Sequence, residues 1–411
     1  MRGVRYDGER MKSLELFTGA GGLALGTHRA GFHHLAVIER DHDACDTLRL
    51  NRARGLIDWT IAEGDVAAFD YTMYAQGIDL LAGGAPCQPF SLGGKHAGEA
   101  DARNMFPQVF RAVRELWPRT FILENVRGLT RTTFRPYFDY IIDQLRTPSL
   151  KAIPGERWEG HKQRITAARA LEGNEASDHG YTVQHRVYNV ADFGVPQQRH
   201  RVFIVGIRTD LPLGWSFPEP THSEEALLYA QYVDGSYWAE HALSRRPIPP
   251  RLVGRIACLA AMPKPPTKRW RTVRDAIADL PEPFDYLQHP SYDNHLGIPD
   301  ARSYVGHTGS PWDWPAKAIK AGDHGNPGGE NMLRRDDGTV RYFTVRELAR
   351  LQSFPDTWHF ANSWTENRRQ LGNAVPVAMA ELLGRKLYEL LTLYESDAAQ
   401  PHETRELTPA F

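Results

Sequence analysis

Cys87 is the residue of this chain whose type and setting best suit chemistry. It lies in the run GGAPCQPFS (83–91), directly after the apolar run Ile78–Ala82, which predicts a buried strand. Open α/β sheets hold their active sites at the carboxyl ends of strands, and a thiol in a loop there is a candidate nucleophile. The alternative is a buried structural cysteine, which suits a loop rich in glycine and proline poorly.

A carboxylate and two guanidinium groups follow in later runs. Glu124 lies at the end of FILENV (121–126), where partial burial would raise its pKa toward the range of a general acid. Arg199 and Arg201 lie in GVPQQRHRVFIVG (194–206), at a turn before a predicted strand, where they could bind a phosphate or a base oxygen. A surface glutamate and ordinary edge-strand charge are the alternatives.

A glycine-rich turn near the start of the chain indicates a nucleotide-like ligand. In LELFTGAGGLALG (14–26) the glycines follow the first predicted strand, so the backbone can approach a ligand at the start of a helix. Glu39 ends the next strand and could bind ribose hydroxyls, and Asp65 follows a third short element. The turn alone could be structural, but the three features in this order predict a ligand of the adenosine type.

These groups need a scaffold of alternating strands and helices. Short apolar runs predict strands at Leu14–Phe17, Leu35–Ile38, Ile78–Ala82 and Thr120–Leu123. Helical patterns between them favour an α/β fold, a doubly wound and mostly parallel sheet with helices on both faces. Two later runs, Val183–Tyr188 and Val202–Ile207, predict a hairpin-like addition to this sheet.

The character of the chain changes after about Arg208. Prolines, glycines and tryptophans become frequent and periodicity fades, which predicts a second, smaller and irregular domain. Pro376 then opens a leucine-rich helical pattern. We predict a catalytic, cofactor-binding domain over 11–208 plus 366–396, an inserted domain over 209–365 and a loose tail over 397–411. The charged run 151–180 is expected to be a surface insertion.

Composition fits a globular protein of two domains. The chain has 411 residues, of which 41% are hydrophobic and 24% charged. Its three cysteines, Cys45, Cys87 and Cys258, argue against a disulfide framework or a structural zinc site, so we expect no metal and a reducing cytoplasm. The polar start shows no secretory signal, and no apolar stretch is long enough to span a bilayer.

A net charge of −1 does not indicate a nucleic-acid partner, but one local stretch does. Nine Lys and Arg residues, and no Asp or Glu, lie between Arg245 and Arg274. This stretch fits a phosphate-binding surface and a basic surface loop equally well, and composition leaves both open.

Six runs, in this order, resemble the sequence blocks of DNA cytosine-5 methyltransferases. They are LFTGAGG, GGAPCQPFS, ENV, QQRHR, RELARLQSFPD (346–356) and QLGNAVP (370–376), and they cover nearly the whole chain. The resemblance implies a Rossmann-like S-adenosylmethionine-dependent methyltransferase domain with an inserted target-recognition domain. The chain resembles prokaryotic modification enzymes of this family in having no added reader modules.

The resemblance implies a role for each matching residue. Cys87 is the nucleophile, Glu124 holds the ring nitrogen of the base, and Arg201 orients its carbonyl oxygen with support from Arg199. The implied contacts to S-adenosyl-L-methionine are Phe17, Gly19, Ala20, Gly21, Gly22, Glu39, Asp65, Val66, Pro86 and Asn373. Contacts to DNA are expected from Gln88, Ser91, Arg245, Arg246, Lys268, Arg269 and Arg271. Some family members have an aromatic residue after the ribose-binding glutamate, where this chain has Arg40.

The implied reaction methylates C5 of a cytosine flipped out of double-stranded DNA, through a covalent bond between Cys87 and C6. We expect a cytoplasmic monomer, no membrane partner, and a restriction endonuclease as a functional partner. An RNA methyltransferase on the same scaffold is one alternative, but its Cys-Phe-Thr motif is missing because Leu259 follows Cys258. A DNA-binding relative without catalysis is another, disfavoured by the intact Cys87, Glu124 and Arg201.

Overall fold

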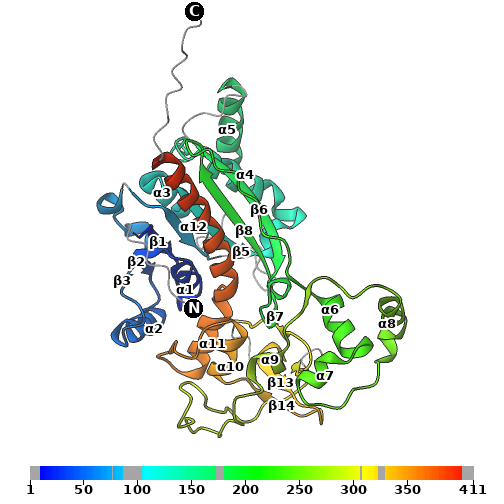
Figure 1. The fold of residues 1–411 in the computed structure, drawn as a ribbon. Coiled ribbons are helices and arrows are strands. Elements are labelled where there is room, and N and C mark those ends of the chain that lie inside the picture. The colour runs from blue at the N-terminus through cyan, green and yellow to red at the C-terminus, as the bar shows by residue number, and fades with distance from the viewer. Residues whose placement is uncertain are drawn as a thin grey trace, which may run out of the picture.

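The structure is a computed structural model that describes residues 10–75, 77–86, 104–172, 180–305, 308–322 and 329–399. A seven-stranded sheet with the order β3-β2-β1-β4-β5-β8-β6 forms the centre of its larger part (Figure 1). The strands are β1 (Lys12–Leu16), β2 (His33–Glu39), β3 (Thr60–Glu63), β4 (Leu80–Gly83), β5 (Thr120–Val126), β6 (Tyr181–Asn189) and β8 (His200–Arg208).

The directions of the strands confirm the predicted sheet. Strands β1 to β5 are parallel neighbours, whereas β8 is antiparallel to both β5 and β6, as expected for a hairpin-like addition. The first strand ends one residue earlier than predicted. Phe17 has a φ of 56°, a left-handed conformation that cannot continue an extended strand.

Helices cover both faces of the sheet, and α12 crosses the face seen in Figure 1. On that face α1 (Gly22–Arg29) and α12 (Val377–Ala399) bury Leu23, Leu383 and Leu387 against Phe203 and Val205. The opposite face is covered by α3 (Phe106–Leu116) and α4 (Arg135–Arg146), which share one hydrophobic cluster with β1. Helix α2 (His42–Ala53) also lies beside the sheet. Apolar residues on both faces of the central strands explain why their runs are nearly continuous in sequence.

The described part of the predicted insertion 151–180 forms a helix, α5 (Trp158–Glu172). Ile165 is fully buried in the same cluster as α4, and Tyr140 Oη lies 3.1 Å from His161 Nδ1. The insertion is therefore anchored to the core of the main domain, while Lys151, Arg157 and Arg169 are exposed to solvent.

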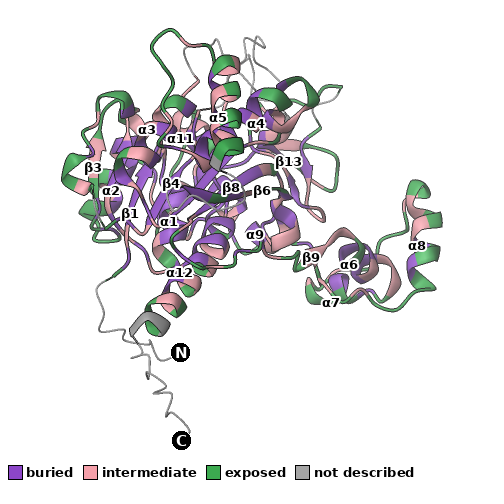
Figure 2. Cartoon of the chain, turned by 90° about the horizontal axis from the view of Figure 1, so that it is seen from above, coloured by how far each residue is buried: buried purple, intermediate pink, exposed green. Residues whose placement is uncertain are grey.

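The chain beyond β8 is built from short elements, as its fading periodicity predicts. A lobe containing α6 (Glu224–Leu228), α7 (Ser236–Glu240) and α8 (Val253–Ala260) extends from the body (Figure 2). Its core is small and centres on Leu227, Tyr237, Trp238 and Trp270. The remaining elements are β7 (Gln197–Gln198), β9 (His222–Ser223), β10 (Lys268–Arg269), α9 (Val273–Ile277), β11 (Ser310–Pro311), β12 (Ala316–Lys317), β13 (Met332–Arg334), β14 (Val340–Tyr342), α10 (Val345–Leu351) and α11 (Trp364–Asn373).

The packing crosses the domain limit that the sequence suggests at residue 365. Leu348 and Trp358, from the block 346–356 and the loop after it, share one cluster with Ala20 and Leu48 of the main domain. The limits themselves stay a prediction, and this packing favours a smaller recognition lobe. Every helix among the described residues is too short or too polar to cross a membrane.

Candidate active site

The carboxyl ends of five strands bring the predicted site residues to one edge of the sheet. Because β1 to β5 are parallel neighbours, the residues at or just beyond their ends lie in a row: Phe17, Glu39, Asp65, Pro86 and Glu124. Figure 1 shows that β7 and the short elements of the second part lie at this edge. Such an edge is where open α/β sheets bind their ligands.

The glycine turn after β1 is held against the carboxylate that ends β2. Gly19 and Gly21 have φ values of 55° and 87°, which favour glycine. The Gly19 amide donates to Glu39 Oε2 at 2.8 Å, while the amides of Arg40 and Asp41 donate to Oε1 at 2.9 and 2.8 Å. Three backbone donors thus fix the carboxylate beside the turn.

The block QLGNAVP packs directly onto this turn, although more than 300 residues separate them in the sequence. A Cβ on Gly22 would lie 2.3 Å from the Val375 carbonyl oxygen, so only glycine fits there. Asn373, at the end of α11, is exposed close to this contact. The structure therefore brings Gly22 together with the block that contains Asn373.

Two residues of this region were missed by the sequence reasoning. Glu15 on β1 is fully buried, and burial raises its pKa well above the ordinary value, with the charge of Glu39 adding to the effect. Its Oε2 has no hydrogen-bond partner among the described residues. Trp358 lies beneath the turn, 3.1 Å from the position of a Cβ on Gly21. The signal for Glu15 was a lone carboxylate inside an apolar strand.

Asp65 and Val66, both predicted cofactor contacts, differ in exposure. Asp65 is exposed, and its Oδ1 accepts a hydrogen bond from the Ala67 amide at 2.8 Å. Val66 is only 3% exposed and belongs to the hydrophobic core, so only its backbone could meet a ligand. Pro86, after β4, is half-buried.

Glu124 and Arg201 form a buried ion pair across β5 and β8. Arg201 Nε lies 2.7 Å from Glu124 Oε1 because Arg201 is in register with Val126, two residues beyond the glutamate. Burial raises the pKa of Glu124, and the charges of Arg201 and Arg199 only partly oppose this. Glu124 Oε2 also faces Gly84, at the start of the loop after β4. A carboxyl group in this position can hold a proton at higher pH than an exposed one.

Arg199 binds backbone carbonyl groups, whereas Arg201 pairs with a carboxylate. Its side chain is buried, with Nη1 donating to the Ile319 carbonyl at 3.0 Å and Nη2 to those of Gly372 and Ala374 at 2.6 and 3.2 Å. Burial lowers its pKa well below the ordinary value. Both terminal nitrogens are therefore engaged by backbone carbonyls, and Arg199 ties the segment around Asn373 to the arginine block.

Cys87, Gln88 and Ser91 lie outside the described residues. The residues leading to them are well held, because Asn125 Nδ2 donates to the buried Ala85 carbonyl at 3.2 Å. The other two cysteines are placed differently. Cys45 is buried in α2 with a pKa raised to about 12 by burial, and Cys258 is exposed on the distant helix α8. Neither lies in a loop at the strand edge.

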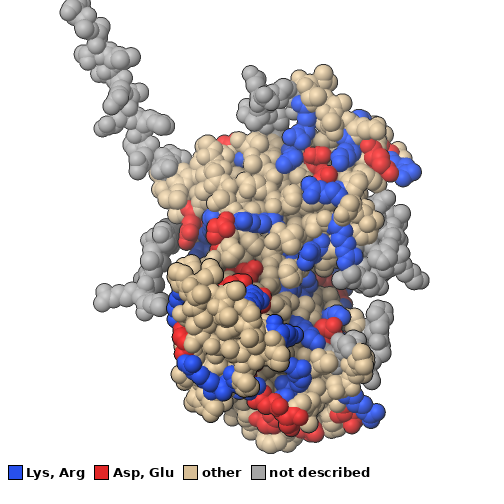
Figure 3. All heavy atoms as spheres, turned by 90° about the vertical axis from the view of Figure 1, so that its right-hand side faces the viewer, with Lys and Arg blue, Asp and Glu red and all other residues tan. Residues whose placement is uncertain are grey.

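The basic stretch 245–274 is largely neutralised by acids from other segments. Arg246 pairs with Asp313 and Asp336 at 3.1 and 2.6 Å, and Arg269 pairs with Asp275 and Glu240 at 2.6 and 2.8 Å. Arg245 donates to the backbone carbonyl of Asp234. In Figure 3, Lys and Arg side chains accordingly lie close to Asp and Glu side chains over this face.

Lys268 and Arg271, like Arg245, have no carboxylate partner in the described ranges. Lys268 and Arg271 are exposed, and Arg271 Nη2 donates to the Asp275 carbonyl at 3.3 Å. Lys268 is in register with His222, whose ring packs against Gly194 in the segment that leads to Arg199. Burial, together with nearby Lys268 and Arg271, lowers the pKa of His222 to about 4. These cations therefore border the arginine block.

A groove of about 860 Å³ lies between the lobe and the sheet of β13 and β14. Its walls include Trp312 and Trp314 together with Arg251 and Arg334. Both arginines are exposed, and neither pairs with a carboxylate in the part of the chain that the structure describes. The groove thus combines unpaired cations and aromatic rings with the carboxylates of Glu224, Asp313 and Asp336.

Oxygens of Asp41, Asp43 and Glu366 lie within 4.8 Å of one another, close to the expected cofactor edge. Arg369 pairs with Asp41 at 2.6 Å and with Glu366 at 2.5 Å. The guanidinium group compensates two of the three charges, so this cluster resembles an ion-pair network more than a metal site.

Taken together, the glycine turn, Glu39 at the end of β2, Asp65 after β3 and the mostly parallel sheet define a Rossmann-like domain suited to an adenosine-type ligand. The chain matches the family model described as C-5 cytosine-specific DNA methylase over residues 11–148, 164–245 and 268–389. The chain belongs to that family, and it is a DNA (cytosine-5) methyltransferase.

Known proteins similar to this chain confirm both the family and the fold. The Type II methyltransferase M.NgoMIV of Neisseria gonorrhoeae is 33% identical over 385 residues, which are 92% of this chain and 97% of that protein. M.Eco47II of Escherichia coli is 33% identical over 388 residues, covering 92% and 79%. Among solved structures, a DNMT2 mutant from Spodoptera frugiperda has a TM-score of 0.56 at 15% identity, covering 92% of this chain and 99% of that one.

Proposed function

We propose that the enzyme methylates C5 of a cytosine flipped out of a specific double-stranded DNA sequence, through a covalent bond between Cys87 and C6. The observation that carries this proposal is the buried Glu124–Arg201 pair beside Gly84, three residues before Cys87 in the sequence. The glycine turn is two strands away in the same sheet, because β4 lies between β1 and β5. Nucleophile, proton donor and methyl donor could thus meet at one edge.

The proposed steps follow from the poor reactivity of cytosine C5. The Cys87 thiolate adds to C6, which moves an electron pair of the ring toward C5 and lets C5 take up a methyl group. Glu124 supplies the proton that N3 needs, and Arg201 holds the carbonyl oxygen of the base. A base then removes the proton from C5, the C6–sulfur bond breaks to restore the C5–C6 double bond and the thiolate, and N3 returns its proton to Glu124.

S-adenosylmethionine fits the residues around the glycine turn. It would supply an electrophilic methyl group, and its ribose hydroxyls and adenine amino group need acceptors. The fixed carboxylate of Glu39 suits the ribose, exposed Asp65 suits the amino group, and Asn373 would close the pocket from the last block. The close packing at Gly21 and Gly22 would keep water from the methyl donor.

The grip on DNA is proposed to come from cations without acidic partners. Lys268 and Arg271 border the arginine block, and Arg251 and Arg334 line the groove of the lobe. Flipping a base costs roughly a few kcal/mol, and contacts between these cations and phosphates would offset it. Arg246 and Arg269, which pair with carboxylates, would instead stabilise the lobe.

The names of the relatives support a biological setting. The similar proteins are Type II methyltransferases, so we propose that this enzyme is the modification half of a restriction-modification system. A restriction endonuclease would then be its functional partner. We propose that it acts as a monomer in the cytoplasm.

The covalent step can be tested by trapping. The target sequence is first mapped by sequencing methylated cytosines in plasmid DNA from cells that express the enzyme. A duplex with 5-fluorocytosine at the target should then give a stable adduct, because fluorine cannot leave as a proton does. Mass spectrometry should find the DNA on the peptide containing Cys87, and Cys87→Ser should abolish both adduct and methylation while retaining DNA binding. An active enzyme that forms no adduct, or forms one elsewhere, contradicts the proposal.

A further inference from the structure

A basic segment follows β5 at the edge of the sheet where the predicted site residues lie. Residues 125–138 contain three arginines, Arg127, Arg131 and Arg135, and no Asp or Glu. Arg135 pairs with Asp139 at 2.7 Å. The guanidinium groups of Arg127 and Arg131, by contrast, have neither a hydrogen bond nor an ion pair among the described residues. Arg127 is also exposed, so its charge is available to a ligand.

Arg127 lies close to His200, at the ends of two paired strands. Val126, the last residue of β5, is in register with Arg201 on the antiparallel strand β8. Arg127 on one strand and His200 on the other are each one position beyond this pair. Burial lowers the pKa of His200, and the charge of Arg127 lowers it further, although Asp192 opposes them. The two side chains are thus within electrostatic reach of each other.

His200 lies on a different face of its strand from the pair proposed to hold the base. Side chains alternate along a strand, so His200 and Arg201 belong to opposite faces of β8. Arg201 pairs with Glu124, which is the proposed donor to N3. A nucleotide with its base against that pair would carry its sugar and phosphates past the strand ends. Exposed cations at those ends suit the backbone of the nucleotide rather than its base.

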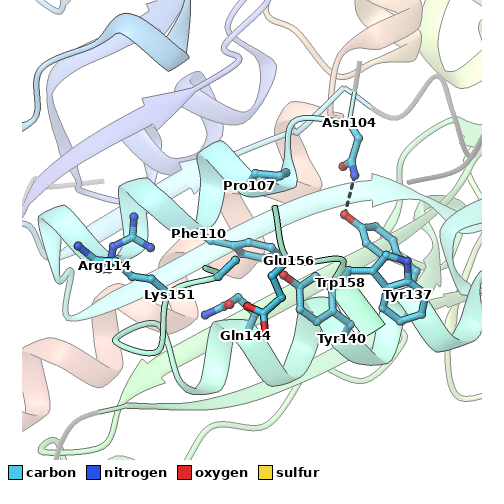
Figure 4. Close-up of a pocket in the computed structure, with 11 residues that line it drawn as sticks. Asn104, Pro107, Phe110, Arg114, Tyr137, Tyr140, Gln144, Lys151, Glu156 and Trp158 are labelled. Atoms are coloured by element: carbon cyan, nitrogen blue, oxygen red, sulfur yellow. Dashed lines mark hydrogen bonds between the residues drawn. The ribbon is translucent and has the colours of Figure 1, made fainter. Parts of the chain in front are cut away.

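The segment that carries Arg127 is fixed on its inner side. Leu129 is fully buried and Phe134 is 8% exposed, both in the hydrophobic cluster shared by α3 and α4. Tyr137, in the first turn of α4, accepts a hydrogen bond from Asn104 Nδ2 at 2.5 Å, which is the dashed line in Figure 4. Because the backbone is already ordered, binding through Arg127 costs little further conformational entropy.

We propose that Arg127, with His200 beside it, binds a phosphate next to the flipped cytosine and so holds the extruded nucleotide in place. The guanidinium group would form charge-assisted hydrogen bonds with the phosphate oxygens, and the imidazole would add a donor. An anion there would also offset the like charges of Arg127 and Arg201. The inference rests on the proposed function, because Glu124 and Arg201 mark where the base lies. Unlike the general grip on DNA, this contact concerns a single nucleotide.

A binding cycle between protein and DNA tests the contact. The Kd for a duplex with the mapped target sequence is measured in the presence of S-adenosylhomocysteine, which has no methyl group to transfer. We expect Arg127→Gln to weaken binding about tenfold and to reduce the slope of log K against log salt by about 0.9. Arg127→Lys keeps the charge and should retain the slope.

Replacing one phosphate at a time by an uncharged methylphosphonate locates the contact. A methylphosphonate beside the target cytosine should weaken binding by the wild-type enzyme and have no further effect in Arg127→Gln. Arg52→Gln is the matched control, because it removes the same charge. Arg52 is exposed, has no carboxylate partner in the described ranges, and lies in the last turn of α2, which leads away from the ligand edge to the start of β3.

Three results would each overturn the proposal. They are unchanged affinity in Arg127→Gln, an equal loss in Arg52→Gln, and a cycle in which Arg127 couples to no phosphate or only to one away from the target cytosine. The cycle measures binding alone and does not depend on Cys87. A trapped adduct on another residue would therefore refute the proposed nucleophile and leave the outcome of the cycle unaffected.

Discussion

Glu39 shows how a single side chain can be prepared for a ligand. Three backbone amides already hold its carboxylate beside the glycine turn, so little reorganisation is needed when ribose hydroxyls arrive. Hydrogen bonds to a charged group contribute about 1.5–3 kcal/mol each. We expect Glu39→Ala to weaken S-adenosylmethionine binding about 10- to 100-fold by calorimetry, and Glu39→Gln to weaken it less. Unchanged affinity in Glu39→Ala would remove this residue from the pocket.

The raised pKa of Glu124 leads to a prediction about how the single-turnover rate depends on pH. Burial raises its pKa, so the carboxyl group stays protonated to higher pH than an exposed glutamate and can donate to N3 there. Raising the pH through that pKa removes the proton, and the single-turnover rate should therefore fall on the alkaline side. Ionisation of the Cys87 thiol would raise the rate with pH, in the opposite direction.

Glu124→Gln separates these two effects. The variant should be at least about 100-fold slower and should lose the falling limb of the pH–rate profile while keeping the rising one. The measurement is the single-turnover rate across the pH range in which the wild-type enzyme is folded. Persistence of the falling limb in Glu124→Gln would assign that titration to another group.

At the scale of elements, the site depends on how closely α1, α11 and α12 pack. Gly22→Ala would place a methyl group 2.3 Å from the Val375 carbonyl oxygen, and the last block would have to move. Overpacking of this kind costs about 1–3 kcal/mol, which should lower Tm by several degrees, and the shift of Asn373 should weaken cofactor binding as well. Gly214→Ala is the control, since a Cβ there meets no atom within 4 Å. Equal melting and affinity in both variants would contradict this account.

The strands that could be predicted from the sequence are those that have a local pattern of their own. Strands β1, β2, β4 and β5 were recognised because each is an apolar run of strand length before a turn. The two-residue strand β7 was missed, because pairing of Gln197 and Gln198 with Ala316 and Lys317 involves no local pattern. The anchoring of α5 was missed for a similar reason: the burial of Ile165 depends on α4 being beside it.

At the scale of the whole molecule, the charge distribution predicts the salt dependence of DNA binding. Neutralising Lys268 and Arg271 should reduce the slope of log K against log salt by about 0.9 for each DNA phosphate that the variant no longer neutralises. Arg251 and Arg334 should behave in the same way if the groove also binds DNA. Arg246→Ala should leave the slope unchanged and lower Tm, because Asp313 and Asp336 each lose one of two arginine partners and keep only Arg274. If the slope fell in Arg246→Ala but not in the variant without Lys268 and Arg271, then Arg246 would be the DNA contact and the other two residues would not.

The order of the motifs and the alternation of strands and helices were determined by the sequence itself. Hydrophobic periodicity, glycine turns and short motifs are local properties, so the sheet, the glycine turn with Glu39, and the family could be recognised from them. The assignment of Cys87 as the nucleophile came from the sequence, and that residue lies outside the described ranges.

Only the tertiary structure decided which charges have partners. Arg246 looked available for DNA in a stretch without acids, yet Asp313 and Asp336 reach it from more than 60 residues away. Arg199 looked like a ligand contact, yet it binds the carbonyls of Gly372 and Ala374. A charge is free or paired according to its neighbours in space, and those neighbours come from distant parts of the chain that meet only when it folds.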